Sequence, residues 1–241
     1  MSKPLGIDVS RWQGVIRWQE IAQHQPTVEF VYIRAGMSWG YIDTQFRANW
    51  QGAKDNHIPR GAYHVIYPDV SIERQMINLF NALAGDYGDL PIALDYELDH
   101  GMDKTTITDG ILHAAQIIKS KTGKQPIIYS RAGWLDAYTV NKGTWHKNFN
   151  FWLAQYLRSG VEHPGLPNLP IGVKMEQVII HQTTDKGAPF GVESKALDYN
   201  RWQLSTSVKE YFGLTQAQKP PMTLEERVAD IERRLSVLEN C

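Results

Sequence analysis

Short apolar runs alternate with longer amphipathic stretches along most of the chain, and this alternation limits the possible folds more than any other feature. Eight runs have the length and composition of strands: 5–9, 30–35, 61–67, 91–97, 125–130, 151–156, 178–183 and 195–200. Helix-like segments separate the earlier runs, at 43–56 with Asp43 as a possible N-cap, at 71–85 after Ser71, and at 106–123 closing on Gly123. The repeated strand, helix, strand order predicts parallel pairing with right-handed crossovers.

The later strands are joined by long irregular stretches with weak helical signal. The pattern therefore predicts an α/β fold, a modified TIM-like barrel of eight strands whose last helices are eroded. A doubly wound open sheet is the alternative, because it uses the same strand and helix order.

A change in composition predicts a domain boundary near the C-terminus. No aromatic residue follows Phe212, and two consecutive prolines lie within residues 217–222. Consecutive prolines favour extended backbone and cannot continue a helix. We expect a barrel domain of residues 1–216, a linker of residues 217–222, and a separate helix of residues 223–241.

The expected C-terminal helix carries a heptad pattern. Apolar residues at spacings of four and three residues form its seam: Leu224, Val228, Ile231, Leu235 and Leu238. The charges flanking this seam are complementary between parallel copies, which favours a homo-oligomer through residues 223–241, and Cys241 is placed to cross-link such copies. Docking of the helix on its own barrel remains the alternative.

Composition excludes some partners. The net charge is −1, so there is no general electrostatic reason to expect nucleic acid or an anionic membrane. We expect no signal peptide and no membrane-spanning segment, because no apolar run is long enough. The single cysteine excludes an internal disulfide framework and is compatible with a reducing cytoplasm.

Polar side chains gather at the predicted strand ends, where the loops of such a barrel converge and where its chemistry takes place. In chain order the strands end with these residues: Asp8, Arg34, His64, Asp95, Glu97, Tyr129, Gln155, Tyr156, Gln182 and Asp198. Four of the ten are carboxylic acids. We expect His64 to be a hydrogen-bonded structural residue rather than a proton carrier.

Asp95 and Glu97 are two positions apart at the end of one strand. Side chains alternate faces along a strand, so these two point the same way, with Cα atoms roughly 6–7 Å apart. Two neighbouring, partly buried acids hold a proton unequally, and glycosidic cleavage needs a protonated acid beside an ionised one. The alternatives are that the pair caps loops or binds an arginine, or that the acids bind a divalent metal. We expect no metal or cofactor, because the histidines lack the spacing of metal ligands.

Several motifs in order resemble one known family. They are "GIDVSRWQG", "GAYHVIYP", "ALDYEL", "IIYS", "WLAQY" and "ALDYNRW". Over roughly residues 5–203 the chain resembles the family 25 glycoside hydrolases, the Chalaropsis-type lysozymes that include many phage endolysins. The resemblance implies a modified β/α barrel that cleaves the β-1,4 bond between N-acetylmuramic acid and N-acetylglucosamine in peptidoglycan.

The resemblance also implies roles for the four acids. Glu97 matches the general acid and base, and Asp95 matches its partner, either a nucleophile or the group that stabilises an intermediate formed by the 2-acetamido group of the substrate. Asp8 and Asp198 match two further acids that tune Glu97 and bind substrate.

Neighbouring residues are expected to complete a substrate groove. The aromatic candidates are Tyr63, Tyr129, Trp152 and Tyr156, since an aromatic face packs on sugar C–H groups; for Trp152 core packing is equally expected. Arg34 is expected to contact substrate or to act as counterion of Asp8 or Asp95, and Gln182 to bind substrate. Relatives commonly have a tryptophan where this chain has His181, so no stacking platform is expected there.

Two non-enzymatic alternatives remain open at this level: a catalytically silent barrel that binds cell-wall glycan, and a virion-associated assembly protein acting through its tail. For the enzyme, the resemblance implies a phage-encoded protein made in the host bacterial cytoplasm and then released to the cell wall.

Overall fold

The computed structural model describes residues 3–140, 144–157 and 159–214. The chain divides into two compact units, Met1–Val208 and Lys209–Cys241. The described part of the second unit is short and contains the end of helix α6 (Val208–Tyr211). The predicted linker of residues 217–222 and the heptad helix of residues 223–241 lie outside the described residues, so both stay predictions.

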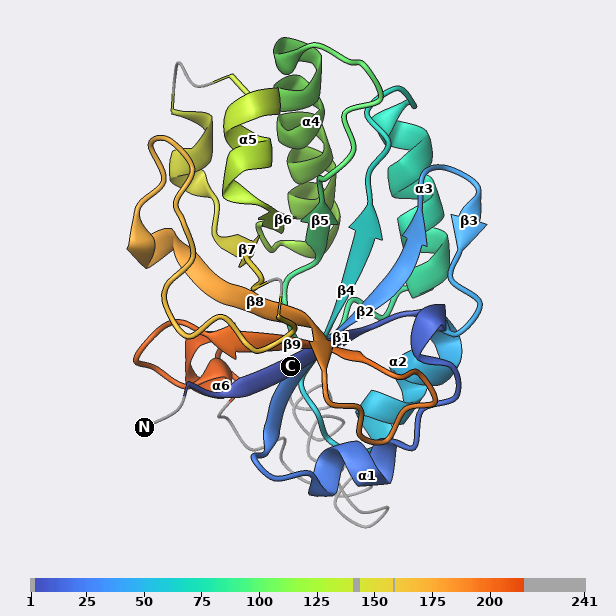
Figure 1. Ribbon diagram of the computed structural model, residues 1–241. Helices are drawn as coiled ribbons and strands as arrows, with labels where there is room; N and C mark the ends of the chain where they lie inside the picture. Colours follow the sequence, from blue (N-terminus) through green and yellow to red (C-terminus); the bar gives the residue numbers. More distant parts are fainter. Residues whose placement is uncertain (1–2, 141–143, 158, 215–241) are drawn as a thin grey trace, which may run out of the picture. The chain divides into compact units, whose positions relative to one another are not determined.

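The first unit is a closed barrel of eight strands (Figure 1). In their order around the barrel the strands are β1 (Leu5–Val9), β2 (Val28–Met37), β4 (Arg60–Val65), β5 (Ala93–Asp95), β6 (Ile127–Ser130), β7 (Phe151–Ala154), β8 (Val178–Gly187) and β9 (Leu197–Trp202). Pairing of β1 with both β2 and β9 closes the ring. This confirms the predicted barrel and excludes the open sheet. A short strand that the sequence did not predict, β3 (Tyr41–Ile42), forms a hairpin with β2.

Helices cover the strands from β2 to β7, as Figure 1 shows. They are α1 (Trp18–Gln23), α2 (Phe46–Asp55), α3 (Ile72–Leu83), α4 (Lys104–Thr122) and α5 (Ala132–Tyr138). Short 3-10 turns supplement them: η1 (Arg11–Gln13), η2 (Trp145–Asn148) and η3 (Met175–Gln177). Only η3 lies in the described connection from β7 to β8, and the described connection from β8 to β9 contains no helix. The expected erosion of the last helices is confirmed.

The helix ends follow local sequence signals. The Ser71 side chain caps α3 by accepting a hydrogen bond from the Arg74 backbone, and Gly123 closes α4 in a left-handed conformation, as predicted. The expected N-cap at Asp43 is wrong, because α2 begins three residues later after Gln45. The Asp43 carboxylate is instead occupied by Arg34, at 2.7 Å, and by the Arg11 backbone N–H, at 3.1 Å.

The direction of β9 corrects a second expectation. The other seven barrel strands pair parallel with one another, but β9 pairs antiparallel with both β8 and β1. Asp198 therefore lies near the start of its strand and not near its end. It still reaches the same mouth of the barrel as Asp8, because these two residues are direct cross-strand partners.

Large aromatic side chains fill the barrel interior below the mouth. Phe30 contacts Trp202 edge to face at 6.3 Å between ring centroids, and Tyr32 lies 4.9 Å from Trp152. Two glycines on the strands that flank β2 make room for them, since a Cβ atom at Gly6 on β1 would collide with the Phe30 ring and one at Gly61 on β4 with the Tyr32 ring. A solid aromatic floor of this kind confines any ligand to the polar mouth.

No helix within the described ranges combines the length and the apolar character that crossing a membrane requires.

Candidate active site

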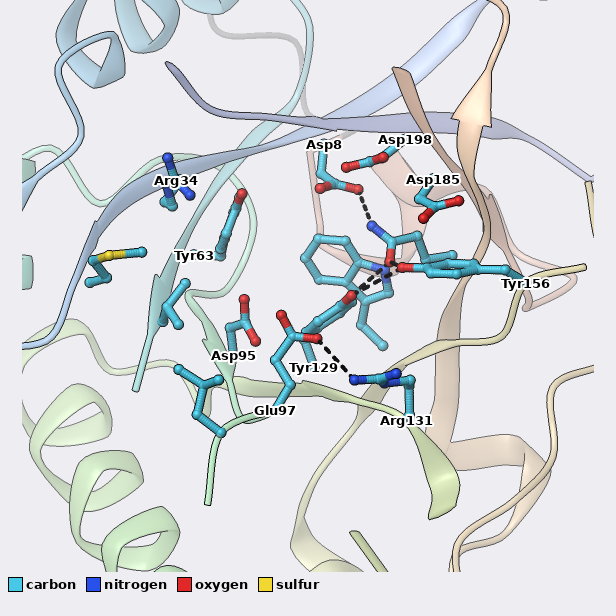
Figure 2. Close-up of a pocket in the computed structure, with 15 residues that line it drawn as sticks. Asp8, Arg34, Tyr63, Asp95, Glu97, Tyr129, Arg131, Tyr156, Asp185 and Asp198 are labelled. Carbon is cyan, nitrogen blue, oxygen red and sulfur yellow. Dashed lines mark hydrogen bonds and ion pairs between the residues drawn. The ribbon is translucent and has the colours of Figure 1, made fainter. Parts of the chain in front are cut away.

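A pocket of about 470 Å³ opens at the barrel mouth where the parallel strands end. All ten site residues expected from the sequence line it, together with residues from the adjoining loops (Figure 2). They are Asp8, Arg34, Tyr63, Asp95, Glu97, Tyr129, Trp152, Tyr156, Gln182 and Asp198. The structure places them together at one end of the barrel.

Asp95 and Glu97 face this pocket from the end of β5. The strand itself is shorter than predicted and stops at Asp95, so Glu97 lies in the following loop. Alternation nevertheless continues past the strand, because the Tyr96 backbone N–H donates to the Tyr129 carbonyl at 3.0 Å and the Ser130 hydroxyl donates to the Tyr96 carbonyl at 2.6 Å. The Tyr96 side chain is buried in the core, and its two neighbours point the other way into the pocket.

The protonation of this pair is governed by burial. Loss of solvent, together with the nearby charges of Glu97 and Asp8, raises the pKa of Asp95 well above its ordinary value. Burial also raises the pKa of Glu97, and the Arg131 guanidinium, 4.0 Å away, opposes this rise. One oxygen of Asp95 is buried without a hydrogen-bond partner in the described structure. A buried, unsatisfied carboxyl oxygen is costly and is available to a ligand.

Asp8 and Asp198 form a second acid pair on β1 and β9. The Asp8 carboxylate accepts hydrogen bonds from the amides of Gln182, at 2.6 Å, and Asn200, at 2.8 Å. Burial raises the pKa of Asp8 to about 6, although these hydrogen bonds oppose the rise. Burial and the charge of Asp8 raise the pKa of Asp198 to about 9, so Asp198 holds the proton and donates it to Asp8.

Gln182 connects the acids to two phenols. Its amide nitrogen donates to Asp8, and its amide oxygen accepts from the hydroxyls of Tyr129, at 2.7 Å, and Tyr156. Both ends of the amide are thus hydrogen-bonded, and Gln182 is only 3% exposed. Its position suits orienting Asp8 more directly than binding substrate.

The remaining predicted aromatics differ in their access to the pocket. Trp152 is 1% exposed, and its indole N–H donates to the Asn200 side chain at 2.7 Å, so it forms the floor of the pocket. Tyr63 meets it edge to face at 6.2 Å and stands on the pocket wall. Core packing therefore accounts for most of the Trp152 surface.

Arg34 has a different ionic partner from the two that the sequence suggested. Its guanidinium pairs with Asp43 at 2.7 Å, with both side chains almost fully buried. It still lines the pocket, and its charge opposes the rise in the pKa of Asp95 that burial causes. Asp43 was overlooked as its partner because the two are brought together by the β2–β3 hairpin.

Two predicted strand-end groups lie outside the pocket lining. His64 is fully buried and its ring Nε2 lies 2.9 Å from the Ser38 carbonyl, in line with the structural role expected for it; burial lowers its pKa to about 4. Gln155 contacts the Asn168 backbone N–H at 2.6 Å and so anchors the loop that follows β7.

Sequence reasoning missed two charged residues of the pocket, Arg131 and Asp185. Arg131 follows the last residue of β6 directly, and Asp185 lies three residues after Gln182 on β8. Both are exposed. Reading each strand end one to three residues further would have included them.

Among the described residues, no group of three or more His, Cys, Asp or Glu side chains is arranged to hold a metal ion. The acids of the pocket are paired with each other and with amides, a set that suits proton chemistry.

Several known proteins are similar to this chain in sequence. Residues 7–192 match the family model described as glycosyl hydrolases family 25. Lysozyme M1 of Streptomyces globisporus is 31% identical over 176 residues, covering 68% of this chain and 57% of that protein. The uncharacterized protein YegX of Escherichia coli K12 is 31% identical over 164 residues, covering 67% of this chain and 59% of YegX. The chain thus spans less than two thirds of the length of these relatives.

A solved structure has a similar fold. The crystal structure of a bacterial lysozyme from Streptomyces coelicolor superposes with a TM-score of 0.71 at 27% identity, covering 89% of this chain and 97% of that one.

Proposed function

The chain belongs to the glycosyl hydrolases of family 25, and we propose that it is a muramidase that cleaves the β-1,4 bond between N-acetylmuramic acid and N-acetylglucosamine in peptidoglycan. The observation that carries the proposal is the Asp95–Glu97 pair, two acids that face one pocket and whose pKa values are both raised by burial. The similarity to lysozyme M1 supports the substrate.

Glu97 is proposed as the general acid and base. Its side chain is 35% exposed, which leaves it accessible to a sugar oxygen, while burial holds its proton to higher pH than in water. It donates this proton to the departing glycosidic oxygen as the bond from that oxygen to C1 breaks. The resulting Glu97 carboxylate then removes a proton from the water that attacks C1.

Asp95 is proposed as the partner that meets the positive charge developing at C1. In its ionised form it either attacks C1 or stabilises an intermediate closed by the substrate 2-acetamido oxygen. The reactive state of the pair therefore carries one proton, on Glu97. Burial and the charges of Glu97 and Asp8 raise the pKa of Asp95, and Arg34 opposes this rise and so favours the ionised form.

Asp8, Asp198 and Gln182 are proposed to position the reacting groups and the substrate. The charge on Asp8 raises the pKa of Asp95, so a proton held between Asp8 and Asp198 adjusts the proton affinity of the reacting pair. Tyr63, Tyr129 and Tyr156 stand on the pocket wall, where a phenol can bind sugar hydroxyls and a ring can pack on sugar C–H groups.

The test is the Glu97→Gln variant acting on purified peptidoglycan. We expect a loss of about 10²–10⁴-fold in the rate at which new reducing ends form, with an unchanged circular dichroism spectrum. The wild-type products should carry N-acetylmuramic acid at the reducing end, as mass analysis after reduction would show.

Glu20→Gln provides the matched control. Glu20 is an exposed glutamate on α1 that pairs with Arg17, and it does not line the pocket. Wild-type rates in Glu97→Gln, or products that end in N-acetylglucosamine, would show that the assignment is wrong. Binding of peptidoglycan by the wild type without any cleavage would favour the silent glycan-binding alternative.

A further inference from the structure

Two of the eight tryptophans of this chain are largely exposed, although indole is among the most favourable side chains to bury. Trp12 is 66% exposed and Trp39 is 52% exposed. The other six are buried or half-buried in the described structure. Exposed large apolar side chains that lie near one another commonly mark a binding surface.

Both exposed tryptophans lie at the barrel mouth. Trp12 belongs to η1, which directly follows β1, and Trp39 comes two residues after the end of β2. β1 and β2 are parallel neighbours, so their C-terminal ends open on the same edge. We call Trp12 and Trp39 together the indole rim.

An arginine covers one face of each indole. The guanidinium carbon of Arg11 lies 4.5 Å from the centroid of the Trp12 ring, and that of Arg74 lies 4.0 Å from the centroid of the Trp39 ring. Such cation–π contacts favour one orientation of the ring and leave the opposite face to solvent. The rim therefore presents two flat, oriented apolar faces.

Hydrogen bonds connect the turn that carries Trp12 to a residue of the pocket. Asp43 accepts hydrogen bonds from the pocket residue Arg34, at 2.7 Å, and from the Arg11 backbone, at 3.1 Å, which fixes the turn that carries Trp12. Arg11 also lies over the Tyr41 ring of the β2–β3 hairpin, 5.4 Å from its centroid.

The turn that carries Trp39 is anchored in a similar way. It follows the pocket residue Met37, and the Ser38 backbone N–H donates to the Val65 carbonyl at 3.0 Å. Val65 also lines the pocket. The turns that carry both indoles are thus anchored to residues of the pocket wall on the side of β1 and β2.

We propose that the indole rim is a sugar-binding subsite for the part of a glycan strand that extends beyond the pocket over β1 and β2. This inference rests on the proposed function, because a polymeric substrate is longer than a pocket of about 470 Å³ can enclose. A flat aromatic face packs on the C–H groups of a pyranose ring, whatever its substituents. The occupant is therefore the sugar backbone, and not the peptides attached to it.

The experiment compares the activity of the protein on long and on short glycan substrates. The variants Trp12→Ala, Trp39→Ala and the double variant are assayed on long glycan strands freed of their stem peptides and on the peptide-free tetrasaccharide of the same repeat. We expect KM for long strands to rise about tenfold in the double variant and kcat to change by less than about twofold, because uniform binding is lost while the reacting groups are unchanged. KM for the tetrasaccharide should stay close to the wild-type value.

Ile77→Ala is the matched control, since Ile77 is a 60% exposed apolar residue on α3, outside the rim. Trp39→Phe should recover part of the lost affinity, because an aromatic face is restored. Unchanged KM for long strands in the double variant would overturn the proposal, as would an equal rise of KM for both substrates. A rise seen only with strands that retain their peptides would assign the rim to peptide binding instead.

Failure of the proposed function is distinguishable from failure of this inference. If the wild type releases no reducing ends from either substrate, the muramidase proposal fails. Affinity electrophoresis in the uncleaved peptide-free strands then tests the rim alone: weaker retardation of the double variant supports it, and equal retardation overturns it.

Discussion

The pocket contains two acid pairs that differ in how their oxygens are satisfied. In the Asp8–Asp198 pair, Asp8 accepts hydrogen bonds from Gln182 and Asn200 and shares a proton with Asp198. In the Asp95–Glu97 pair, one Asp95 oxygen has no partner in the described structure and Glu97 has only a 4.0 Å contact with Arg131. Carboxyl groups whose hydrogen bonds are complete are held in place, whereas an unsatisfied one is ready for a ligand.

Strand geometry explains this difference. Asp8 and Asp198 are direct partners on antiparallel strands, where Cβ atoms approach to about 4.5–5.5 Å and the two side chains can share a proton. Asp95 and Glu97 follow one another along a single chain segment, at a Cα spacing of roughly 6–7 Å. The difference supports the proposal that the second pair carries the chemistry and the first positions the reacting groups.

The strongest test of this division is to neutralise one acid of each pair without changing its shape. Asp95→Asn should lower kcat on peptide-free glycan strands by about 10²–10⁴-fold, because the charge that meets the developing cation is lost. Asp198→Asn should lower kcat only about tenfold, since an amide can still donate to Asp8. A larger loss in Asp198→Asn than in Asp95→Asn would reverse the division.

The second test uses the dependence of stability on pH. Burial raises the pKa of Asp198 from 3.8 to about 9, so the folded protein binds a proton that the unfolded chain has released. This stabilisation is complete below pH 3.8 and is lost as pH rises toward 9, at up to about 1.4 kcal/mol per pH unit. Asp198→Asn removes this contribution, so its free energy of unfolding relative to the wild type should increase with pH.

Urea unfolding between about pH 5 and pH 8 measures this difference. Glu20→Gln, which changes an exposed acid far from the pocket, should follow the wild type over the whole range. Parallel curves for Asp198→Asn and the wild type would mean that Asp198 is ionised in the folded protein.

The smallest expected effect comes from a change at Arg131, whose guanidinium lies 4.0 Å from the Glu97 carboxylate. Arg131 lowers the pKa of Glu97, so Arg131→Met raises that pKa and keeps the general acid protonated to higher pH. The alkaline limb of the kcat/KM profile should therefore move to higher pH, by less than about one unit because Arg131 is exposed. High salt should move the wild-type profile the same way, and a shift to lower pH in the variant would contradict the assignment of Glu97.

The sequence was sufficient for the strands and for the position of the acids. Alternation of apolar and polar residues depends only on neighbouring side chains, so it located all eight barrel strands and placed Asp95 and Glu97 on one side of the chain. Eight of the ten residues at the predicted strand ends line one pocket, because parallel strands open on a common edge; His64 and Gln155 do not line it.

Contacts between distant segments were decided only by the tertiary structure. The reversal of β9, the pairing of Arg34 with Asp43, and the entry of Arg131 and Asp185 into the pocket all depend on how the chain closes on itself. The alternation of apolar and polar residues in the sequence predicts on which face of a strand a side chain lies. It does not predict which residue from another segment that side chain contacts. The unequal sharing of protons between the two acid pairs follows from those partners and from burial, and therefore belongs to the folded barrel alone.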